Sequence, residues 1–205
     1  MLKDNFLKHL TLYILIPLFL VALVVLVVEG TRKPLEESNS STEAFLIDSS
    51  CSSKYMTKKI GKAVYKNAER YLEENTVYKQ AGKGVIEKTT YIDCSGLVIA
   101  CYNKALEKTK YKLPFVDVSS QSLFSEYITP TNKPNKGDLI FLSYRNDKVV
   151  SHVGIVDEIK DDTVYFIDAI PNEENDSGKA VNIRSYKIDD NKIVGYGIMK
   201  LLKKE

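Results

Sequence analysis

An uncharged apolar run near the start of the chain limits what the sequence can fold into. The run, LTLYILIPLFLVALVVLVV, covers Leu10–Val28, nineteen residues without a charge. A helix of that length, at about 1.5 Å per residue, nearly spans a hydrocarbon core of about 30 Å. A helix buried in a water-soluble domain is rarely apolar on every side over such a length. We therefore expect residues 1–30 to form a membrane anchor or a signal segment.

Charges beside this run predict the side of the membrane on which the rest of the chain lies. Lys3 and Lys8 precede the run, whereas Arg32 and Lys33 follow it. A basic leader before the first helix favours an inside amino terminus, although the flanking charges are nearly balanced. A weak signal-peptidase-like site after Gly30 leaves a cleaved, secreted form open. Because the run is long for a cleaved signal, we expect a single-pass membrane protein with an extracytoplasmic domain.

The segment after the apolar run changes in composition twice. Residues 31–53 are rich in Ser, Thr and Glu, have poor periodicity, and are expected to form a flexible linker. Residues 54–205 are long enough for one domain with a sizeable core. The net charge of +2, with both signs interspersed, is not typical of a nucleic-acid-binding protein.

Helical periodicity is confined to the first half of this domain. Apolar residues at three- and four-residue spacings predict an amphipathic helix over 56–74 and a largely buried helix over 94–107. A short helix with a serine N-cap is expected over 119–127. We expect the glycine-containing stretch 77–92 to be a loop and residues 129–137 to be a turn.

Strand-like segments follow in the second half. β-Branched and aromatic runs separated by short polar turns occupy 138–144, 152–159, 163–170, 180–186 and 194–202. Turn-separated strands at this spacing predict an antiparallel meander or a small barrel. Helices followed by strands indicate the α+β class, with the N-terminal helices packed on the C-terminal sheet.

A cysteine stands where polar residues give way to the second predicted helix. The start of a helix carries partial positive charge and free N–H groups, which would stabilise a Cys94 thiolate. A nucleophilic cysteine also needs a base, and His152 is the one histidine beyond the apolar run. Asp168, on the next predicted strand, could face His152 across a hairpin and orient the imidazole. Each residue also has an ordinary structural interpretation, and the spacing alone leaves both open.

The other cysteines do not suggest a metal site or a disulfide framework. Cys51, Cys94 and Cys101 are separated by 43 and 7 residues, and with only two histidines a zinc site is not expected. Cys94 and Cys101 would lie two helical turns apart, farther than a disulfide tolerates. We interpret Cys101 as a core residue and Cys51 as an incidental thiol. No metal or cofactor is expected.

Four sequence blocks resemble the NlpC-type family of papain-like cysteine peptidases, which are cell-wall endopeptidases. The blocks are YIDCSGLVIACY, NKGDLIFLS, VSHVGIVDEI and VYFIDAI, and the resemblance covers about residues 60–170. It implies a papain-like fold in which Cys94 is the nucleophile, His152 the base and Asp168 the third polar residue. It also implies substrate contacts near the thiol, for which the candidates are Tyr78, Asp93, Ser95 and Ser151.

Two positions depart from the family pattern. The family usually has histidine, and sometimes Asn or Gln, where this chain has Asp168. Its Tyr-x-x-Gly-Gly motif is displaced here, where Tyr78 begins YKQAGKG.

The resemblance implies hydrolysis of peptidoglycan stem peptides, typically between D-glutamate and a diamino acid. A muramoyl-peptide amidase, an acyl transferase on the same fold and an inactive wall-binding domain remain alternatives.

Overall fold

The fold is known from a computed structural model that describes residues 52–145, 147–174 and 177–204. The predicted membrane segment lies outside the described residues, as does the predicted linker up to residue 51. Helix α3, Ser52–Glu73, begins two residues inside that linker. Over the described residues, the structure contains no helix that is both long and apolar enough to cross a bilayer.

The three predicted helices are confirmed. They are α3, α4 at Cys94–Leu106 and α5 at Ser120–Glu126. Helix α3 buries Ile60, Val64 and Ala68, which recur every four residues along one side. The Ser119 hydroxyl accepts a hydrogen bond from the backbone of Ser122 and caps α5, as the sequence predicts.

A six-stranded antiparallel sheet forms the second half of the domain. Its strands are β5 (Ile128–Thr131), β6 (Leu139–Leu142), β7 (His152–Lys160), β8 (Thr163–Ala169), β9 (Val181–Lys187) and β10 (Ile193–Met199). Strands β6 to β9 form the predicted meander, and the strand order is β5-β10-β6-β7-β8-β9. Strand β10 thus returns to the free edge of β6, with β5 outside it.

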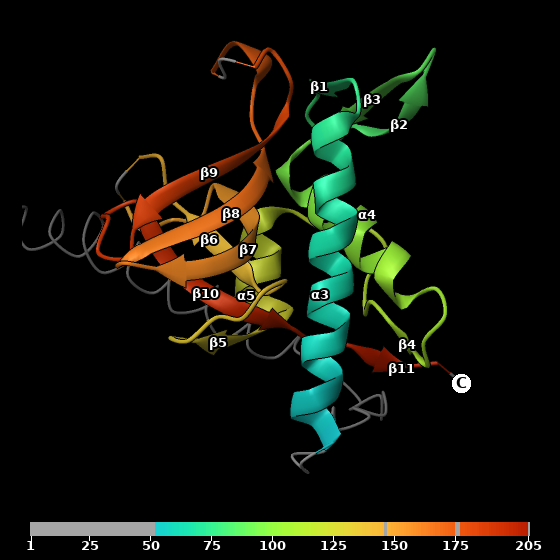
Figure 1. The fold of residues 1–205 in the computed structure, drawn as a ribbon, viewed down its shortest axis with the longest axis vertical. Helices are drawn as coiled ribbons and strands as arrows, with labels where there is room; N and C mark the ends of the chain where they lie inside the picture. Colours follow the sequence, from blue (N-terminus) through green and yellow to red (C-terminus); the bar gives the residue numbers. More distant parts are fainter. Residues whose placement is uncertain (1–51, 146, 175–176, 205) are drawn as a thin grey trace, which may run out of the picture. The chain divides into compact units, whose positions relative to one another are not determined.

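The two faces of this sheet bury different apolar clusters. One face packs against α3 and α4, which lie beside each other along the sheet in Figure 1. Its strand residues are Leu139, Phe141, Val153, Ile155, Ile167, Ala169 and Val181. The opposite face carries a smaller cluster of Ile140, Leu142, Val156, Val164 and Phe166. Successive strand residues alternate between these clusters, as the pleat requires.

The prediction of a loop over 77–92 is wrong, because this region forms a small sheet. Strands β1 (Thr76–Tyr78), β2 (Lys83–Ile86) and β3 (Thr89–Ile92) pair in the order β1-β3-β2 at one end of α3 (Figure 1). The β2–β3 turn uses Glu87 and Lys88 at φ of 48° and 67°, without the glycine or asparagine that usually marks such a hairpin. The four-residue strands β2 and β3 also contain glycine or polar residues, unlike the equally short but continuously apolar LIFL of β6.

Other short strands were not expected either. Strand β5 enters the turn predicted at 129–137, and its Pro130 is tolerated because β5 is an edge strand. The last predicted strand, 194–202, divides into β10 and β11 (Leu202–Lys203), and β11 pairs with β4 (Tyr111–Lys112).

A close backbone contact fixes α3 against the entry to β6. A Cβ atom on Gly61 would lie 2.3 Å from the carbonyl oxygen of Lys136, and one on Gly137 would lie 2.1 Å from that of Gly61. Gly137 also has φ of +90°. The Tyr102 hydroxyl of α4 donates to the Gly137 carbonyl at 2.8 Å. Both long helices are therefore tied to the strand that begins the main sheet.

Candidate active site

Helix α4 begins at Cys94, and Asp93 is its N-cap. The Asp93 carboxylate accepts hydrogen bonds from the Gly96 backbone at 2.7 Å and the Ser95 hydroxyl at 3.2 Å. Its other oxygen accepts from the backbone of Ala81 at 2.6 Å. A buried carboxylate thus holds the start of the helix and the turn after β1 together, and so sets the position of the thiol.

The Cys94 thiol lies at the meeting point of three elements. Its side chain lies close enough to His152 of β7 and Tyr78 of β1 to contribute to the shift in the pKa of each. Burial, together with Cys94 and Asp93 nearby, raises the pKa of Tyr78, which keeps the phenol neutral. The Tyr78 backbone donates to the Asn172 side chain at 2.8 Å, which ties β1 to the segment after β8.

His152 is held on its far side by a carboxylate. Its Nε2 lies 2.7 Å from Asp168 Oδ2, which leaves Nδ1 as the ring nitrogen for the thiol. Burial by itself would lower the pKa of His152, but hydrogen bonds to Asp168 and Cys94, and their charges, raise it to about 9. The imidazole is therefore protonated at neutral pH. The structure brings together the three side chains proposed as catalytic from the sequence.

A β-bulge places Asp168 on the same face as His152. Strands β7 and β8 pair regularly from Lys160 opposite Thr163, and the register then shifts between Val156 and Glu158. Beyond the shift Asp168 lies opposite Gly154, two residues along β7 from His152. Without the register shift, Asp168 would lie opposite residue 155, whose side chain points to the helices. The two residues are diagonal neighbours, and their contact depends on this bulge.

Neighbouring residues support the bulge and leave room beside it. Asp157, the extra residue, accepts a hydrogen bond from the Tyr65 hydroxyl at 2.8 Å and forms an ion pair with Lys136. At Gly154 a Cβ atom would lie 2.7 Å from the Phe166 ring and 3.3 Å from the Asp168 Cβ. The absence of a side chain at Gly154 therefore gives the carboxylate its place against the strand.

Two further residues of the site were missed by the sequence reasoning. Arg184 of β9 donates from Nε to both Asp168 oxygens at 3.0 Å, and its Nη2 also forms an ion pair with Asp168. The same Nη2 donates to the Tyr144 hydroxyl at 2.5 Å. The Tyr144 ring packs against His152, with ring centroids 5.2 Å apart. The contact of Arg184 with Asp168 can be recognised only when β9 is known to pair with β8. The sequence offers one signal of it, a cation within a predicted strand.

Comparison with known proteins identifies the group to which this arrangement belongs. The NlpC/P60 family model matches residues 75–187, more than half of the chain. The chain belongs to the NlpC/P60 family. Membership confirms the resemblance seen in the sequence blocks and supports an α+β papain-like fold. The NlpC/P60 match includes Tyr78, Cys94, His152, Asp168 and Arg184.

Several solved structures are similar to this NlpC/P60 chain. NlpC1 from Trichomonas vaginalis is 19% identical with a TM-score of 0.43, over 72% of this chain and 45% of that protein. An NLP/P60 family protein from Staphylococcus aureus, described as similar to lipoprotein, is 21% identical with a TM-score of 0.43, over 68% of this chain and 41% of that one. The chain thus spans less than half the length of either. No curated protein matches it.

The remaining substrate-contact candidates lie close to this NlpC/P60 site. Ser95 is buried beside Asp93, to which its hydroxyl donates. Ser151 precedes His152, and its hydroxyl accepts from the backbone of Tyr144 at 3.2 Å. These contacts show what the two serines do within the fold, and their contact with substrate stays a prediction.

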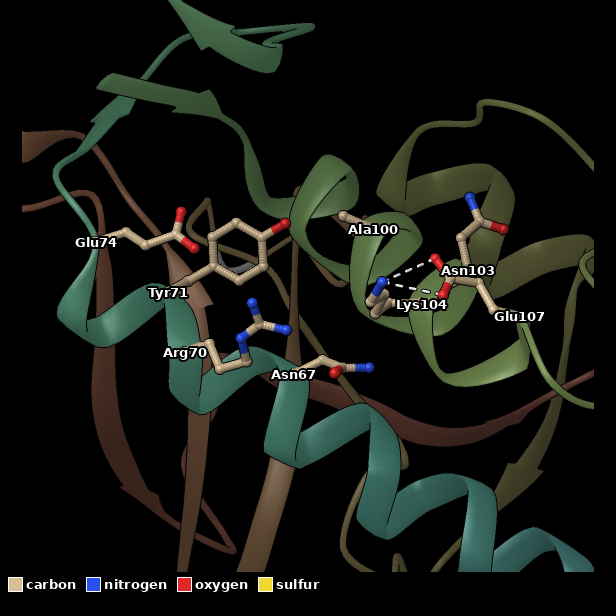
Figure 2. A pocket seen from close by; sticks show the side chains of 8 residues that line it. All are labelled: Asn67, Arg70, Tyr71, Glu74, Ala100, Asn103, Lys104 and Glu107. Carbon is tan, nitrogen blue, oxygen red and sulfur yellow. Dashed lines mark hydrogen bonds and ion pairs between the residues drawn. The ribbon is translucent and has the colours of Figure 1, made fainter. Parts of the chain in front are cut away.

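Cys101 and a nearby hollow lie apart from the site. Cys101 is a free, fully buried thiol whose pKa is raised by burial, so its interpretation as a core residue is confirmed. A hollow of about 280 Å³ lies between α3 and α4, and Figure 2 shows the side chains that line it. Its lining is Asn67, Arg70, Tyr71, Glu74, Ala100, Asn103, Lys104 and Glu107. No residue of the candidate active site lines it, so we place the chemistry at Cys94.

Proposed function

We propose that this protein is a cysteine endopeptidase that hydrolyses amide bonds in peptidoglycan stem peptides. The observation that carries the proposal is the His152 imidazole, which is hydrogen-bonded to the Asp168 carboxylate and lies next to the Cys94 thiol at the start of α4. A thiol at a helix start, next to a protonated imidazole, is the environment that activates a cysteine nucleophile. Membership of NlpC/P60 supports the cell wall as the source of substrate.

The mechanism uses the two protonation states of His152. The Cys94 thiolate attacks the carbonyl carbon of the scissile amide, and the resulting oxyanion accepts hydrogen bonds from first-turn N–H groups of α4, including that of Cys94. His152 then donates its proton to the leaving amine, which leaves a thioester on Cys94. The neutral imidazole next takes a proton from a water molecule as the water oxygen attacks the thioester. The C–S bond then breaks, which releases the carboxylic acid and restores the Cys94 thiolate. Asp168 keeps the ring oriented throughout.

For the bond cleaved, we propose the link between D-glutamate and a diamino acid, as the sequence resemblance implies. Tyr78 touches the thiol and would form one side of the substrate cleft. Asp93 and Ser95 would contact a substrate amine next to the thiol. The Asp93 carboxylate already accepts three donors from the protein, so any substrate bond would be added to its role as a helix cap.

We also propose that residues 1–30 attach the protein to the cell membrane, with the catalytic domain on the outer side. The support is the uncharged run Leu10–Val28 and the linker that follows it. An exported domain on a tether would lie where peptidoglycan is found, so the topology fits the proposed substrate.

Digestion of purified peptidoglycan tests the activity. The full chain and a Cys94→Ala variant are incubated with the substrate, and the soluble products are identified by mass spectrometry. We expect the wild type to release fragments that end in D-glutamate and fragments that begin with the diamino acid. The Cys94→Ala variant should release neither. Free amino groups on L-alanine would instead indicate a muramoyl-peptide amidase, and an absence of new ends would reject hydrolysis.

A further inference from the structure

Arg184 lies against the Asp168 carboxylate and beside the imidazole of His152. Asp168 is fully buried, and within the described residues its side chain bonds to His152 and Arg184. The guanidinium donates to both carboxylate oxygens, and one of its terminal nitrogens lies 3.4 Å from His152 Nε2. Two cationic groups therefore share one carboxylate.

The charges around His152 come from four elements. Cys94 faces it from α4, Asp168 from β8, Arg184 from β9 and Tyr144 from the segment after β6. A neutral residue at position 168 would leave the arginine as an unbalanced cation beside the imidazole, which disfavours a second positive charge on the ring. A neutral residue at position 184 would leave a buried carboxylate with a single partner, which is costly.

Arg184 is also held in place from the other side. Its Nη2 donates to the Tyr144 hydroxyl and its Nη1 to the Tyr186 hydroxyl at 3.3 Å. The guanidinium carbon lies 5.5 Å from the centroid of the Phe166 ring and 5.7 Å from that of the Tyr186 ring. Such a packed guanidinium is a fixed part of the site rather than a mobile surface charge.

We propose that Arg184 is a positioning residue and that Asp168 and Arg184 act as one charge-balanced unit that orients His152. The unit explains how a carboxylate can stand at the position where the family usually has histidine. Arg184 does not touch the reacting atoms; it orients the carboxylate and balances its charge. This role rests on the proposed function for its consequence in catalysis, but its effect on Cys94 can be measured without any substrate.

A double-mutant cycle in the full chain tests the unit. The rate of iodoacetamide alkylation at Cys94, resolved by mass spectrometry from that at the other cysteines, is measured at about pH 7 for wild type, Asp168→Asn, Arg184→Met and the double variant. We expect Asp168→Asn to slow alkylation about tenfold or more, because the unbalanced arginine opposes the imidazolium. The double variant, in which both charges are gone, should recover most of that loss.

A second readout follows the imidazole itself. The His152 resonances are titrated by NMR in the same four proteins, with His9→Gln used to assign the two histidines. The pKa of His152 should fall in Asp168→Asn and rise again in the double variant. Lys187→Met is the matched control, because it removes an exposed cation of β9. Within the described residues, the Lys187 side chain bonds only to the backbone carbonyl of Asp161. This variant should leave alkylation and titration unchanged.

The outcomes are separable from those of the peptidoglycan digestion. Independent effects, with the double variant as slow as the product of the singles predicts, would overturn the charge-balanced unit. If Arg184→Met does not fold, Arg184→Lys replaces it, because lysine keeps the charge without the forked geometry of the guanidinium. Its Cys94 alkylation rate should then lie between those of wild type and Asp168→Asn. A rate equal to that of wild type would overturn the proposal. A positive cycle in a chain that cuts no peptidoglycan would reject the proposed function alone.

Discussion

The protonation of one imidazole links the chemistry of the site to its stability. His152 is 4% exposed, yet its carboxylate and thiol neighbours raise its pKa from 6.5 to about 9. The charged ring is thus the favoured form over the range in which most proteins work. Because the same contacts hold β7, β8 and α4 together, a change of pH that removes the proton affects both the reaction and the fold.

The reaction should therefore fail on the alkaline side. The proton that His152 gives to the leaving amine is lost as pH rises through about 9. We expect the rate of amide hydrolysis to fall with an apparent midpoint near that pH. Initial rates across a pH series, with short exposure at each pH, provide the measurement. A rate that stays level well beyond this midpoint would contradict the assignment of His152 as the proton donor.

The free energy of unfolding should also depend on the protonation of His152, and should likewise fall as pH rises. A folded pKa above the unfolded value means that the contribution of His152 is fully present below about pH 6.5 and is lost as pH rises through about 9. Urea unfolding of wild type and His152→Gln should give free energies of unfolding that differ most near pH 6 and converge near pH 10. A difference that grows with pH would contradict this linkage.

Single residues show how far the site could be predicted from the sequence. Cys94 and His152 were predictable, because the chain offers one histidine beyond its apolar run and one cysteine at a predicted helix start. Asp168 followed from the hairpin, although the bulge that turns it toward His152 leaves no plain trace in the sequence. Arg184 was not predictable, since its contact requires knowledge that β9 pairs with β8 in a given register.

At the scale of elements, the site depends on how two strands and one helix start are aligned. The bulge in β7 moves Asp168 to the face of His152, while the cap at Asp93 fixes where α4 begins. Both features act through backbone geometry. Substitutions that disturb alignment should consequently reduce activity without removing any reacting group.

Gly154→Ala tests the alignment of the strands. The added Cβ would press on the Phe166 ring and on Asp168, which should cost about 1–3 kcal/mol in the free energy of unfolding and lower hydrolysis further. Chemical denaturation and initial rates measure the two effects. Gly195→Ala in β10 is the matched control, because its nearest atom would be at an ordinary 3.5 Å. Equal effects of the two substitutions would contradict the account.

Asp93 variants separate the cap from a role in substrate binding. Asp93→Ala should lower the free energy of unfolding by about 1 kcal/mol or more, because Gly96, Ser95 and Ala81 lose their acceptor. Asp93→Ser keeps a capping oxygen and should recover part of that stability. If Asp93 also binds a substrate amine, the serine variant will show a raised KM. A KM equal to that of wild type would restrict Asp93 to the cap.

Elements were predictable where they carry a clear apolar pattern or a capping residue. The helices α3 and α4 and the meander β6–β9 carry enough periodicity to be recognised from the sequence. Strands β1 to β3 were missed because they lack the continuous apolar run of β6, and because the turn between β2 and β3 lacks its usual residues. Strand β5 was obscured by Pro130, which an edge strand accommodates. These missed strands matter, since β1 carries Tyr78 to the thiol.

At the scale of the whole molecule, the proposed attachment of an exported domain to the membrane through residues 1–30 can be tested by deletion. Deletion of residues 10–28 should release the protein from the membrane fraction while hydrolysis of soluble stem peptides continues. Fractionation of cells, followed by an assay of each fraction, makes the comparison. A full chain found only in the soluble cell interior would contradict the proposed anchor, without bearing on the chemistry at Cys94.

The most direct test concerns the sulfur and the imidazole as a pair. Alkylation of the full chain by iodoacetamide near pH 6, resolved by residue, compares Cys94, which is 7% exposed, with the fully buried Cys101 in wild type and in His152→Ala. The account predicts that wild-type Cys94 reacts about a hundredfold faster than Cys101 and that His152→Ala abolishes this advantage. Equal reactivity of the two thiols in wild type, or fast alkylation of Cys94 in the absence of His152, would contradict it.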